Sequence, residues 1–527
     1  MAGSRQTGSE GSAAVEAQAD VLVLGGGPAG TWAALSAARA GARVVLADKG
    51  FCGTSGATAA AGTAIWHVPP EPAARETALA SREALGGFLA DRAWGARVLD
   101  QTIDGVQELA EWGYPFPRDR DGREQRASLQ GPEYMRLMRK RVKAAGVTVL
   151  DQSPALRLLV DADGTVSGAA GIRRQRGDDW RVTAGAVVVA TGGCAFLSRA
   201  LGCNVLTGDG YLFAAEAGAE LSGMEFSNAY GLSAEYASVT KALFFNWATF
   251  SYADGTEIPG AGSARGRSVI ARTLLEQPVY ARLDKADPAI AAAMRRAQPN
   301  FFLPHDRQGI DPFRDRFPIA LRLEGTVRGT GGLRLIDAQC ATTVPGLYAA
   351  GDAATREPIC GGFTGGGSHN AAWAMSSGRW AGAGAAAFAR HRGGVGATSG
   401  AGRAGLTEEA DAAVDADALV RSVQDEVMPL DRNYFRSQAG LTDSLARLDG
   451  LWHRLRRSRG GGHDRVLRTR ESLAMLATAR WMYRSALART ETRGMHRRDD
   501  HAALDERQRH HLTAAGLDEI TVTARAA

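Results

Sequence analysis

The stretch that decides the fold is DVLVLGGGPAGTWAALSAARAGARVVLAD, from Asp20 to Asp48. It opens with an apolar run that predicts a buried strand, continues through an alanine-rich helical pattern, and ends in a second apolar run. Gly25, Gly27 and Gly30 stand where the first strand passes into the helix. Glycine-rich turns also occur for purely structural reasons. The complete order of strand, turn, helix, strand and acid, however, is that of a βαβ unit that binds a dinucleotide.

Each residue of this unit has its own physical task. Gly25 allows a tight turn, Gly27 lets the backbone approach a pyrophosphate, and Gly30 lets helix and strand pack closely. The first helical turn, at Ala29, offers free N–H groups and a partial positive charge to the pyrophosphate. Asp48 follows Gly30 by 18 residues, where a carboxylate can accept hydrogen bonds from ribose hydroxyls. The sequence therefore predicts a site for the ADP half of a dinucleotide.

Bulk composition narrows the class of protein further. A chain of 527 residues is too long for one core, so two or three domains are expected. A hydrophobic content of 45% and a net charge of only +5 indicate a globular protein that does not bind nucleic acid. No apolar run reaches the ~20 residues that a membrane helix needs. We expect residues 1–18 to be a disordered leader rather than a signal peptide.

The cysteines are odd in number and widely spaced, which suits neither a disulfide framework nor a zinc or iron–sulfur site. We therefore expect no metal centre and a location in the reducing cytoplasm. The five positions are Cys52, Cys194, Cys203, Cys340 and Cys360.

Three later segments carry signals of the same nucleotide-binding sheet. WRVTAGAVVVATGG (180–193) predicts a buried strand that ends at Thr191 and Gly192. PGLYAAGDAA (345–354) predicts another strand that ends at Gly351-Asp352. Residues 361–370 form a glycine-rich loop that opens into a long helical pattern.

The segments between these signals predict the domain organisation. Residues 223–324 are richer in aromatic residues and less periodic, which indicates an inserted capping domain of α+β type. Residues 19–222 and 325–392 would then form one discontinuous, Rossmann-like α/β domain. Residues 393–407 are typical of a linker, and 408–527 are expected to form a helical C-terminal domain.

Taken together, these motifs resemble the FAD-dependent fumarate reductase and succinate dehydrogenase flavoprotein superfamily. That superfamily includes L-aspartate oxidase and the alpha subunit of adenylylsulfate reductase. The resemblance covers nearly the whole chain and extends to SGATAAAG (55–62), TGDG (207–210), MEF (224–226), RSVIAR (267–272) and ETRGMHRRDD (491–500). SGATAAAG is most similar to the adenylylsulfate reductase branch.

The resemblance implies that the dinucleotide is FAD. Asp48 would hold the adenosine ribose, and Asp352 would bond the ribityl chain. A helix opening at Ser368 would direct its N-terminus at the flavin, where it stabilises the negative charge of the reduced ring. A flexible turn is the alternative for that loop. The implied cofactor-binding positions are Gly25, Gly27, Ala29, Gly30, Asp48, Lys49, Ser55, Gly56, Gly62, Ala155, Thr191, Gly192, Asp209, Gly351, Asp352, Ser368 and Asn370.

The sequence departs from the superfamily where chemistry is concerned. Members that attach FAD covalently use a histidine in the segment matching SGATA (55–59), which has none, so we expect a noncovalent flavin. Of the two histidines that bind substrate in the dicarboxylate enzymes, one is matched by the stretch at Tyr230 and the other by Val327, beside Arg328. A substrate arginine is matched by Gly365. A faithful succinate or fumarate site is therefore not expected.

Three residues are candidates for catalysis. Arg267 matches an arginine proposed to exchange a proton with the substrate in the dicarboxylate branch. A guanidinium rarely releases a proton, so orienting an anionic substrate and forming a surface salt bridge are the alternatives. His369 could act as acid or base near neutral pH, or hydrogen-bond within the loop. Tyr230 could donate to the substrate in place of the lost histidine, or pack as a core aromatic residue.

We therefore expect an FAD-dependent oxidoreductase that moves a hydride between a C–H or C–N bond of a small, anionic substrate and flavin N5. Oxygen or a separate electron acceptor would complete the reaction, and a homo-oligomer is possible. The alternatives are a flavoprotein electron-transfer subunit that works with a separate redox partner, and a non-catalytic interaction protein that flavin stabilises.

Overall fold

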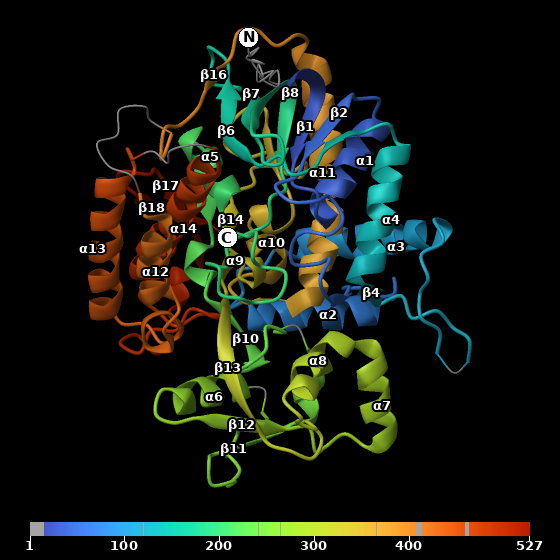
Figure 1. The fold of residues 1–527 in the computed structure, drawn as a ribbon, viewed down its shortest axis with the longest axis vertical. Coiled ribbons are helices and arrows are strands. Elements are labelled where there is room, and N and C mark those ends of the chain that lie inside the picture. Colours follow the sequence, from blue (N-terminus) through green and yellow to red (C-terminus); the bar gives the residue numbers. More distant parts are fainter. Residues whose placement is uncertain are drawn as a thin grey trace, which may run out of the picture.

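The computed structural model describes residues 15–526 apart from 120, 241, 264, 365, 407–413 and 459–462. Figure 1 shows a sheet flanked by helices at the top, a smaller α+β part at the bottom and a helical part at one side. Residues 1–14 of the expected leader lie outside the described residues. The leader's predicted end at residue 18 is wrong, because Val15–Leu24 already form strand β1.

Parallel strands form the base of the nucleotide domain. They lie in the order β8 (Asp178–Val189), β1, β2 (Val44–Ala47) and β5 (Thr148–Leu150). A further strand, β15 (Leu347–Ala349), pairs in parallel with the end of β8. The apolar second half of β1 is buried, as expected for a parallel strand that helices cover. This is the predicted α/β arrangement, and the expectation is confirmed.

The far edge of this sheet is antiparallel. Strands β6 (Ala155–Val160) and β7 (Val166–Arg173) form a hairpin whose second strand pairs with the first half of β8. The short β16 (Ser399–Gly400), in the expected linker, pairs with β6.

Helix α11 (Gly366–Arg392) packs along α1 (Pro28–Arg39) on one face of the sheet (Figure 1). The two helices approach closely because glycines of α11 face the backbone of α1. A side chain at Gly378 would overlap the carbonyl of Ala29, and one at Gly382 would overlap that of Ala33. The neighbouring helices are α2 (Pro72–Leu85), α3 (Arg92–Glu111) and α4 (Gly131–Ala144).

The capping part contains an antiparallel sheet of four strands in the order β10-β13-β12-β11. An aromatic core fills it, which includes Phe244, Phe245, Phe301, Phe302 and Phe317. The elements are β10 (Ala229–Ala234), β11 (Thr249–Ser251), α6 (Gly266–Leu274), β12 (Val279–Arg282), α7 (Pro288–Ala297), α8 (Pro299–Arg307) and β13 (Phe317–Glu324).

The C-terminal part is helical only in its first portion, which comprises α12 (Ala416–Val427), α13 (Gln438–Leu455) and α14 (His463–Ala488). The expectation of a wholly helical domain is wrong at its end. Strands β17 (His510–Ala515) and β18 (Thr521–Ala526) form a hairpin there. Strand β17 pairs with β9 (Leu221–Ser222), which pairs with β14 (Gly332–Leu333).

A buried ionic cluster joins this C-terminal part to Glu225, which lies between β9 and β10. The guanidinium of Arg489 contacts Glu225 at 2.8 Å and Glu491 at 2.9 Å, and all three side chains are inaccessible to solvent. Glu491 also accepts from Arg493 at 2.6 Å. Burial raises the pKa of Glu225 to about 6, although Arg489 opposes it. Removing one partner would leave an uncompensated buried charge, so the cluster fixes how the two parts pack.

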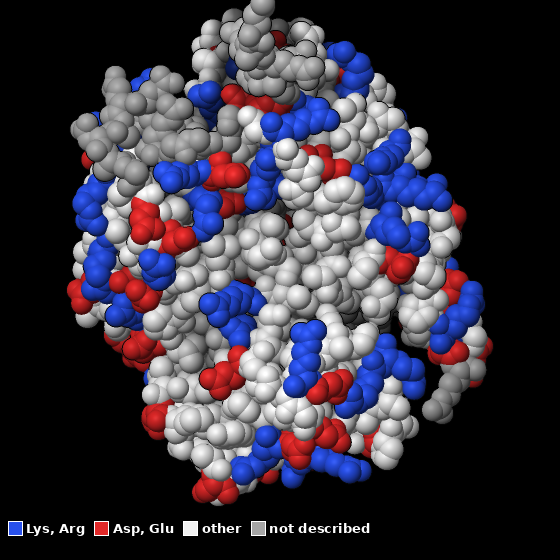
Figure 2. Space-filling model, in the orientation of Figure 1, with Lys and Arg blue, Asp and Glu red and all other residues white. Residues whose placement is uncertain are grey.

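The described residues also bear on disulfides, metal sites and membrane-spanning helices. The five cysteines are buried and unbridged, and no group of three or more potential metal ligands occurs among the described residues. No described helix is both long enough and apolar enough to cross a membrane. Figure 2 shows basic and acidic side chains interspersed around a largely uncharged centre of the face in view.

Candidate functional site

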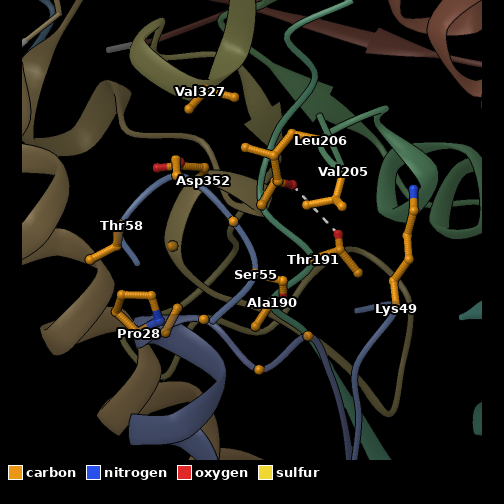
Figure 3. Close-up of a pocket in the computed structure, with 18 of the residues that line it drawn as sticks. Pro28, Lys49, Ser55, Thr58, Ala190, Thr191, Val205, Leu206, Val327 and Asp352 are labelled. Atoms are coloured by element: carbon orange, nitrogen blue, oxygen red, sulfur yellow. Dashed lines mark hydrogen bonds between the residues drawn. The ribbon is translucent and has the colours of Figure 1, made fainter. Parts of the chain in front are cut away.

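The carboxyl ends of the parallel strands open into one large cleft. The chain leaves β1 at Gly25, β8 at Ala190 and β15 at Ala350, and the turns that follow line the cleft together with the start of α1. The cleft encloses about 1390 Å³ of empty space, its open mouth included. Figure 3 shows its lining, with Val327 and Asp352 at the end away from Ala190. A crevice at this edge of a parallel sheet is where such folds bind ligands.

The structure brings nearly all the predicted cofactor-binding residues together here. Of the predicted positions, only Gly30 and Ser368 are outside the described lining. Gly30 instead serves the predicted close packing, because a side chain there would overlap the carbonyl of Gly25. Ser368 lies in the first turn of α11, and its carbonyl accepts from Trp66 N–H at 3.1 Å. The predicted positions in the lining are Gly25, Gly27, Ala29, Asp48, Lys49, Ser55, Gly56, Gly62, Ala155, Thr191, Gly192, Asp209, Gly351, Asp352 and Asn370.

Asp48 organises the glycine-rich turn as well as facing the cleft. Its Oδ2 accepts from the N–H of Gly26 at 2.5 Å, and its Oδ1 accepts from the N–H of Gly50 at 2.7 Å and from Ser55 Oγ at 2.9 Å. Three donors thus hold a buried carboxylate in one orientation. Two carboxylate oxygens offer about four acceptor sites, so one remains for a ribose hydroxyl.

Lys49, the next residue, connects three parts of the chain. Its ammonium group donates to Thr207 Oγ1 at 2.7 Å and lies 2.6 Å from both Asp209 and Glu471. Burial alone would lower the pKa of Lys49, but the two carboxylates outweigh burial and raise it. The lysine therefore stays charged beside the cleft.

The opposite wall is held by α11. Ser377 Oγ accepts from Gly351 N–H at 3.0 Å, and Trp373 Nε1 donates to the Gly351 carbonyl at 3.1 Å. Asp352 forms an ion pair with Arg356, a fully buried side chain that also donates to the Thr326 carbonyl at 2.7 Å. These contacts hold Asp352 in place just after β15.

The described residues fit FAD. A side chain at Gly27 or Gly56 would meet no other atom within 4 Å, so the backbone of both is open to the cleft. Asn370 donates from Nδ2 to the Val327 carbonyl at 3.0 Å, while its buried Oδ1 has no hydrogen-bond partner in the described chain. An acceptor left over in the wall matches a ligand that carries N–H or O–H donors. No histidine or cysteine occurs in the described lining.

Arg267 lies outside the described lining, at the start of α6 in the capping part. Its side chain is accessible to solvent and forms no hydrogen bond or ion pair within the described chain. The protein atoms around the Arg267 guanidinium nevertheless reduce its hydration, and this desolvation lowers its pKa. The positive charge of Arg328, which does line the cleft, lowers the pKa further.

His369 and Tyr230 are also outside the described lining. The His369 ring is buried, lies 4.3 Å from the Trp66 ring, and contacts Ser368 Oγ at 3.1 Å through Nδ1. Tyr230 donates its hydroxyl to the carbonyls of Val427 and Met428, each at 3.0 Å. These contacts favour packing for Tyr230 over a contact with substrate.

Sequence reasoning missed several residues that line the cleft. Thr207 stands in the TGDG motif and could have been found there, since only Asp209 of that motif was predicted to bind the cofactor. Arg328 stands beside Val327, the position that matches a substrate histidine of the dicarboxylate enzymes, so it too could have been found from the sequence. Others carry no motif signal, among them Tyr134, Val205, Leu206 and Phe213.

Comparison with known families identifies the cofactor class. Residues 20–229 match the FAD binding domain family, and residues 422–525 match the C-terminal domain of the fumarate reductase flavoprotein. The L-aspartate oxidase of Streptomyces coelicolor is 29% identical over 64% of this chain, a match that spans only 63% of that protein. In Methanothermobacter marburgensis, one of the subunits of the CoM/CoB fumarate reductase is 26% identical over 92% of this chain and 94% of its own.

Solved structures share the fold. A variant of the Escherichia coli quinol fumarate reductase flavoprotein superposes with a TM-score of 0.84 at 20% identity, over 97% of both chains. Adenylylsulfate reductase of Archaeoglobus fulgidus gives a TM-score of 0.75 at 19% identity, over 97% of this chain and 96% of its own. The chain thus contains an FAD binding domain and the C-terminal domain of the fumarate reductase flavoprotein, and it is similar to FAD-dependent oxidoreductases of the fumarate reductase type; the predictions of this resemblance and of FAD are confirmed.

Proposed function

We propose that this protein binds FAD noncovalently and moves a hydride between a C–H or C–N bond of a small, anionic substrate and the flavin. The observation that supports this proposal is the border between the cleft and the capping part. Arg328 lines the cleft directly after β13, and its charge acts on Arg267 of α6. FAD supplies a two-electron acceptor when bound. The chain supplies cations beside it that can hold an anion.

Arg267 is the residue proposed to contact the substrate. It has no ion-pair partner in the described chain, so it is available for a bidentate contact with a carboxylate. The lowered pKa of its guanidinium eases proton transfer, but an arginine still favours its charged form. Orientation of the substrate is therefore the role that the geometry supports best. The relatives whose names specify aspartate or fumarate act on anions of this size.

Anaerobic mixing of the FAD-loaded protein with amines, amino acids and carboxylates tests the proposal. A true substrate bleaches the absorbance of oxidised flavin. Arg267→Ala should slow bleaching about tenfold or more while FAD stays bound. Arg272→Ala is the matched control, because Arg272 lies on the same helix in an exposed ion pair with Asp499 at 3.2 Å. If no donor bleaches the flavin, the oxidase or dehydrogenase direction of the proposal fails, and if Arg267→Ala reacts as fast as wild type, the proposed role of Arg267 fails.

An electron-carrying subunit is a second candidate. The Methanothermobacter relative is named as one of the subunits of a fumarate reductase and aligns along nearly the whole chain. Light scattering on the protein isolated from its own cells would show a stable hetero-complex in that case. A protein that is isolated without a partner subunit and passes electrons directly to oxygen would contradict this second candidate function.

A further inference from the structure

Tyr134 of α4 lines the cleft and has a hydrogen-bond donor that the described chain does not use. Its side chain is buried, and its hydroxyl oxygen accepts from Trp32 Nε1 at 2.7 Å. A phenol also carries one hydrogen of its own, whereas an indole N–H can only donate. The Tyr134 hydrogen therefore cannot go to Trp32, and no other described residue accepts it.

An unused donor of this kind is uncommon in a protein interior. Buried hydroxyl groups nearly always have a partner, because leaving one unsatisfied is costly. Burial raises the pKa of Tyr134, so the phenol keeps its proton and remains a donor at neutral pH. A donor without a described acceptor, in the wall of a ligand cleft, indicates a hydrogen bond to the ligand.

The start of α4 explains why Tyr134 reaches the cleft. Gly131, the first residue of the helix, donates its N–H to the Ala61 carbonyl at 3.0 Å. A side chain at Gly131 would overlap the carbonyls of Thr58 and Ala61, so only glycine lets the helix begin directly against this segment. Thr58 lines the cleft, and Figure 3 shows it on the same side as Pro28. Tyr134 stands one helical turn beyond this contact.

Trp32 determines which part of a dinucleotide Tyr134 meets. It follows Pro28, the first residue of α1, by four residues, so the two side chains lie on one face of that helix. Long side chains of a helix lean toward its N-terminus, and Pro28 lines the cleft. Tyr134 therefore meets α1 near its first turn, where free N–H groups and the helix dipole favour the pyrophosphate.

The indole of Trp32 is itself held in place. It is fully buried, stacks on the ring of Trp112 with 5.3 Å between centroids, and has the guanidinium of Arg379 over its face at 4.2 Å. An aromatic ring packed in this way directs its N–H at one position. Trp32 thus orients the Tyr134 hydroxyl without touching the ligand itself.

We propose that Tyr134, positioned by Trp32, donates its hydroxyl hydrogen to a pyrophosphate oxygen of FAD. A hydrogen bond to a charged acceptor is stronger than one between neutral groups, so this contact adds to the affinity for a cofactor that is bound without a covalent link. The inference requires FAD binding but no substrate. It therefore goes beyond the proposed hydride transfer and does not depend on it.

Equilibrium dialysis of the holoenzyme measures this contact. Tyr134→Phe should raise the Kd for FAD about tenfold or more. ADP carries two linked phosphates without a flavin, so its Kd, measured by displacement of FAD, should rise by a similar factor. Tyr114→Phe is the matched control, because Tyr114 is also buried, accepts from the Gln130 N–H at 2.6 Å and is outside the described lining. This control should leave both Kd values unchanged.

A double variant separates the ligand contact from effects on folding. Tyr134→Phe alone also leaves the buried Trp32 N–H without its acceptor, so the Tm should fall. In Trp32→Phe that N–H is already absent, and adding Tyr134→Phe should cause little further loss of Tm. The same addition should still raise the Kd for FAD about tenfold. A tyrosine that only packs against Trp32 would not weaken FAD binding further in this background.

Three results would overturn the inference. The first is an unchanged Kd for FAD in Tyr134→Phe, and the second is an effect on FAD that disappears in the Trp32→Phe background. The third is a raised Kd for FAD with an unchanged Kd for ADP, because the acceptor would then lie on the flavin half. If Trp32→Phe does not fold, the comparison of FAD with ADP decides. The expected Kd values combined with no donor that bleaches the flavin would count against the proposed function and leave the role of Tyr134 standing.

Discussion

The ammonium group of Lys49 lies 2.6 Å from Oε1 of Glu471, which links the nucleotide cleft to helix α14 of the C-terminal part. The same group lies 2.6 Å from Asp209, so one cation stands between two carboxylates. The three side chains are between 17% and 21% exposed, and the contact is thus largely shielded from solvent. Lys49 therefore couples the packing of two distant segments at the cofactor cleft.

Removing the cation should cost more stability than removing one carboxylate. Lys49→Met leaves Asp209 and Glu471 with their repulsion uncompensated, and we expect a loss of about 3 kcal/mol. Glu471→Gln should cost about 1 kcal/mol, and adding it to Lys49→Met should restore about 1 kcal/mol. Urea unfolding measures all three variants. Arg468→Gln, an exposed pair on the same helix, is the control, and strictly additive losses would contradict the coupling.

Two glycines of the first turn should respond differently to alanine. Gly27→Ala places a methyl group in open space, so the FAD-free protein should keep its Tm while FAD binds about tenfold more weakly. Gly30→Ala forces a methyl group into the Gly25 carbonyl, so the FAD-free protein itself should lose several kcal/mol or fail to fold. Thermal melting and FAD titration separate the two effects. Equal FAD affinity in Gly27→Ala and wild type would show that the ligand does not approach this turn.

Tyr230→Phe decides between the two interpretations of that tyrosine. The hydroxyl hydrogen is shared by the carbonyls of Val427 and Met428, so its loss should cost about 1 kcal/mol and leave substrate oxidation unchanged. Stopped-flow reduction of the flavin and urea unfolding are the measurements. A fall in the reduction rate of about tenfold at unchanged stability would instead place the hydroxyl on the substrate.

The pair His511–Glu357 should make stability depend on pH. Its atoms lie 3.1 Å apart and are buried. Burial alone would lower the pKa of His511, but Glu357 outweighs burial and raises it above 6.5. For Glu357, burial is outweighed by His511 and Ser222, which lower its pKa. The stabilisation by His511 is thus complete below the pKa of an unfolded histidine and is lost as the pH rises through the folded value.

His511→Gln should therefore reduce the Tm more at about pH 6 than at about pH 9, where the wild-type histidine is itself neutral. Differential scanning calorimetry at both pH values measures this. His501→Gln, at an exposed position, is the control for unspecific effects. A penalty that grows toward high pH would contradict the assigned direction of the His511 pKa.

Local patterns were sufficient for the nucleotide domain. Gly25, Thr191 and Asp352 each follow a buried apolar run, and parallel strands end at one edge, so their proximity could be inferred from the order of the segments. The hairpin of β17 and β18 was missed because its stability comes from pairing with β9, a partner nearly three hundred residues away. Arg328 could be noticed but not assigned, since only the folded structure shows that it lines the cleft.

The sequence by itself determined the class of cofactor, because pyrophosphate binding needs glycines and a strand end within one short stretch from Asp20 to Asp48. Only the tertiary structure decided what lies around the cleft. Lys49 meets Glu471 through a contact between segments far apart in the chain, and the charge of Arg328 acts on Arg267. Such contacts leave no local period or motif, since packing rather than spacing brings these side chains together.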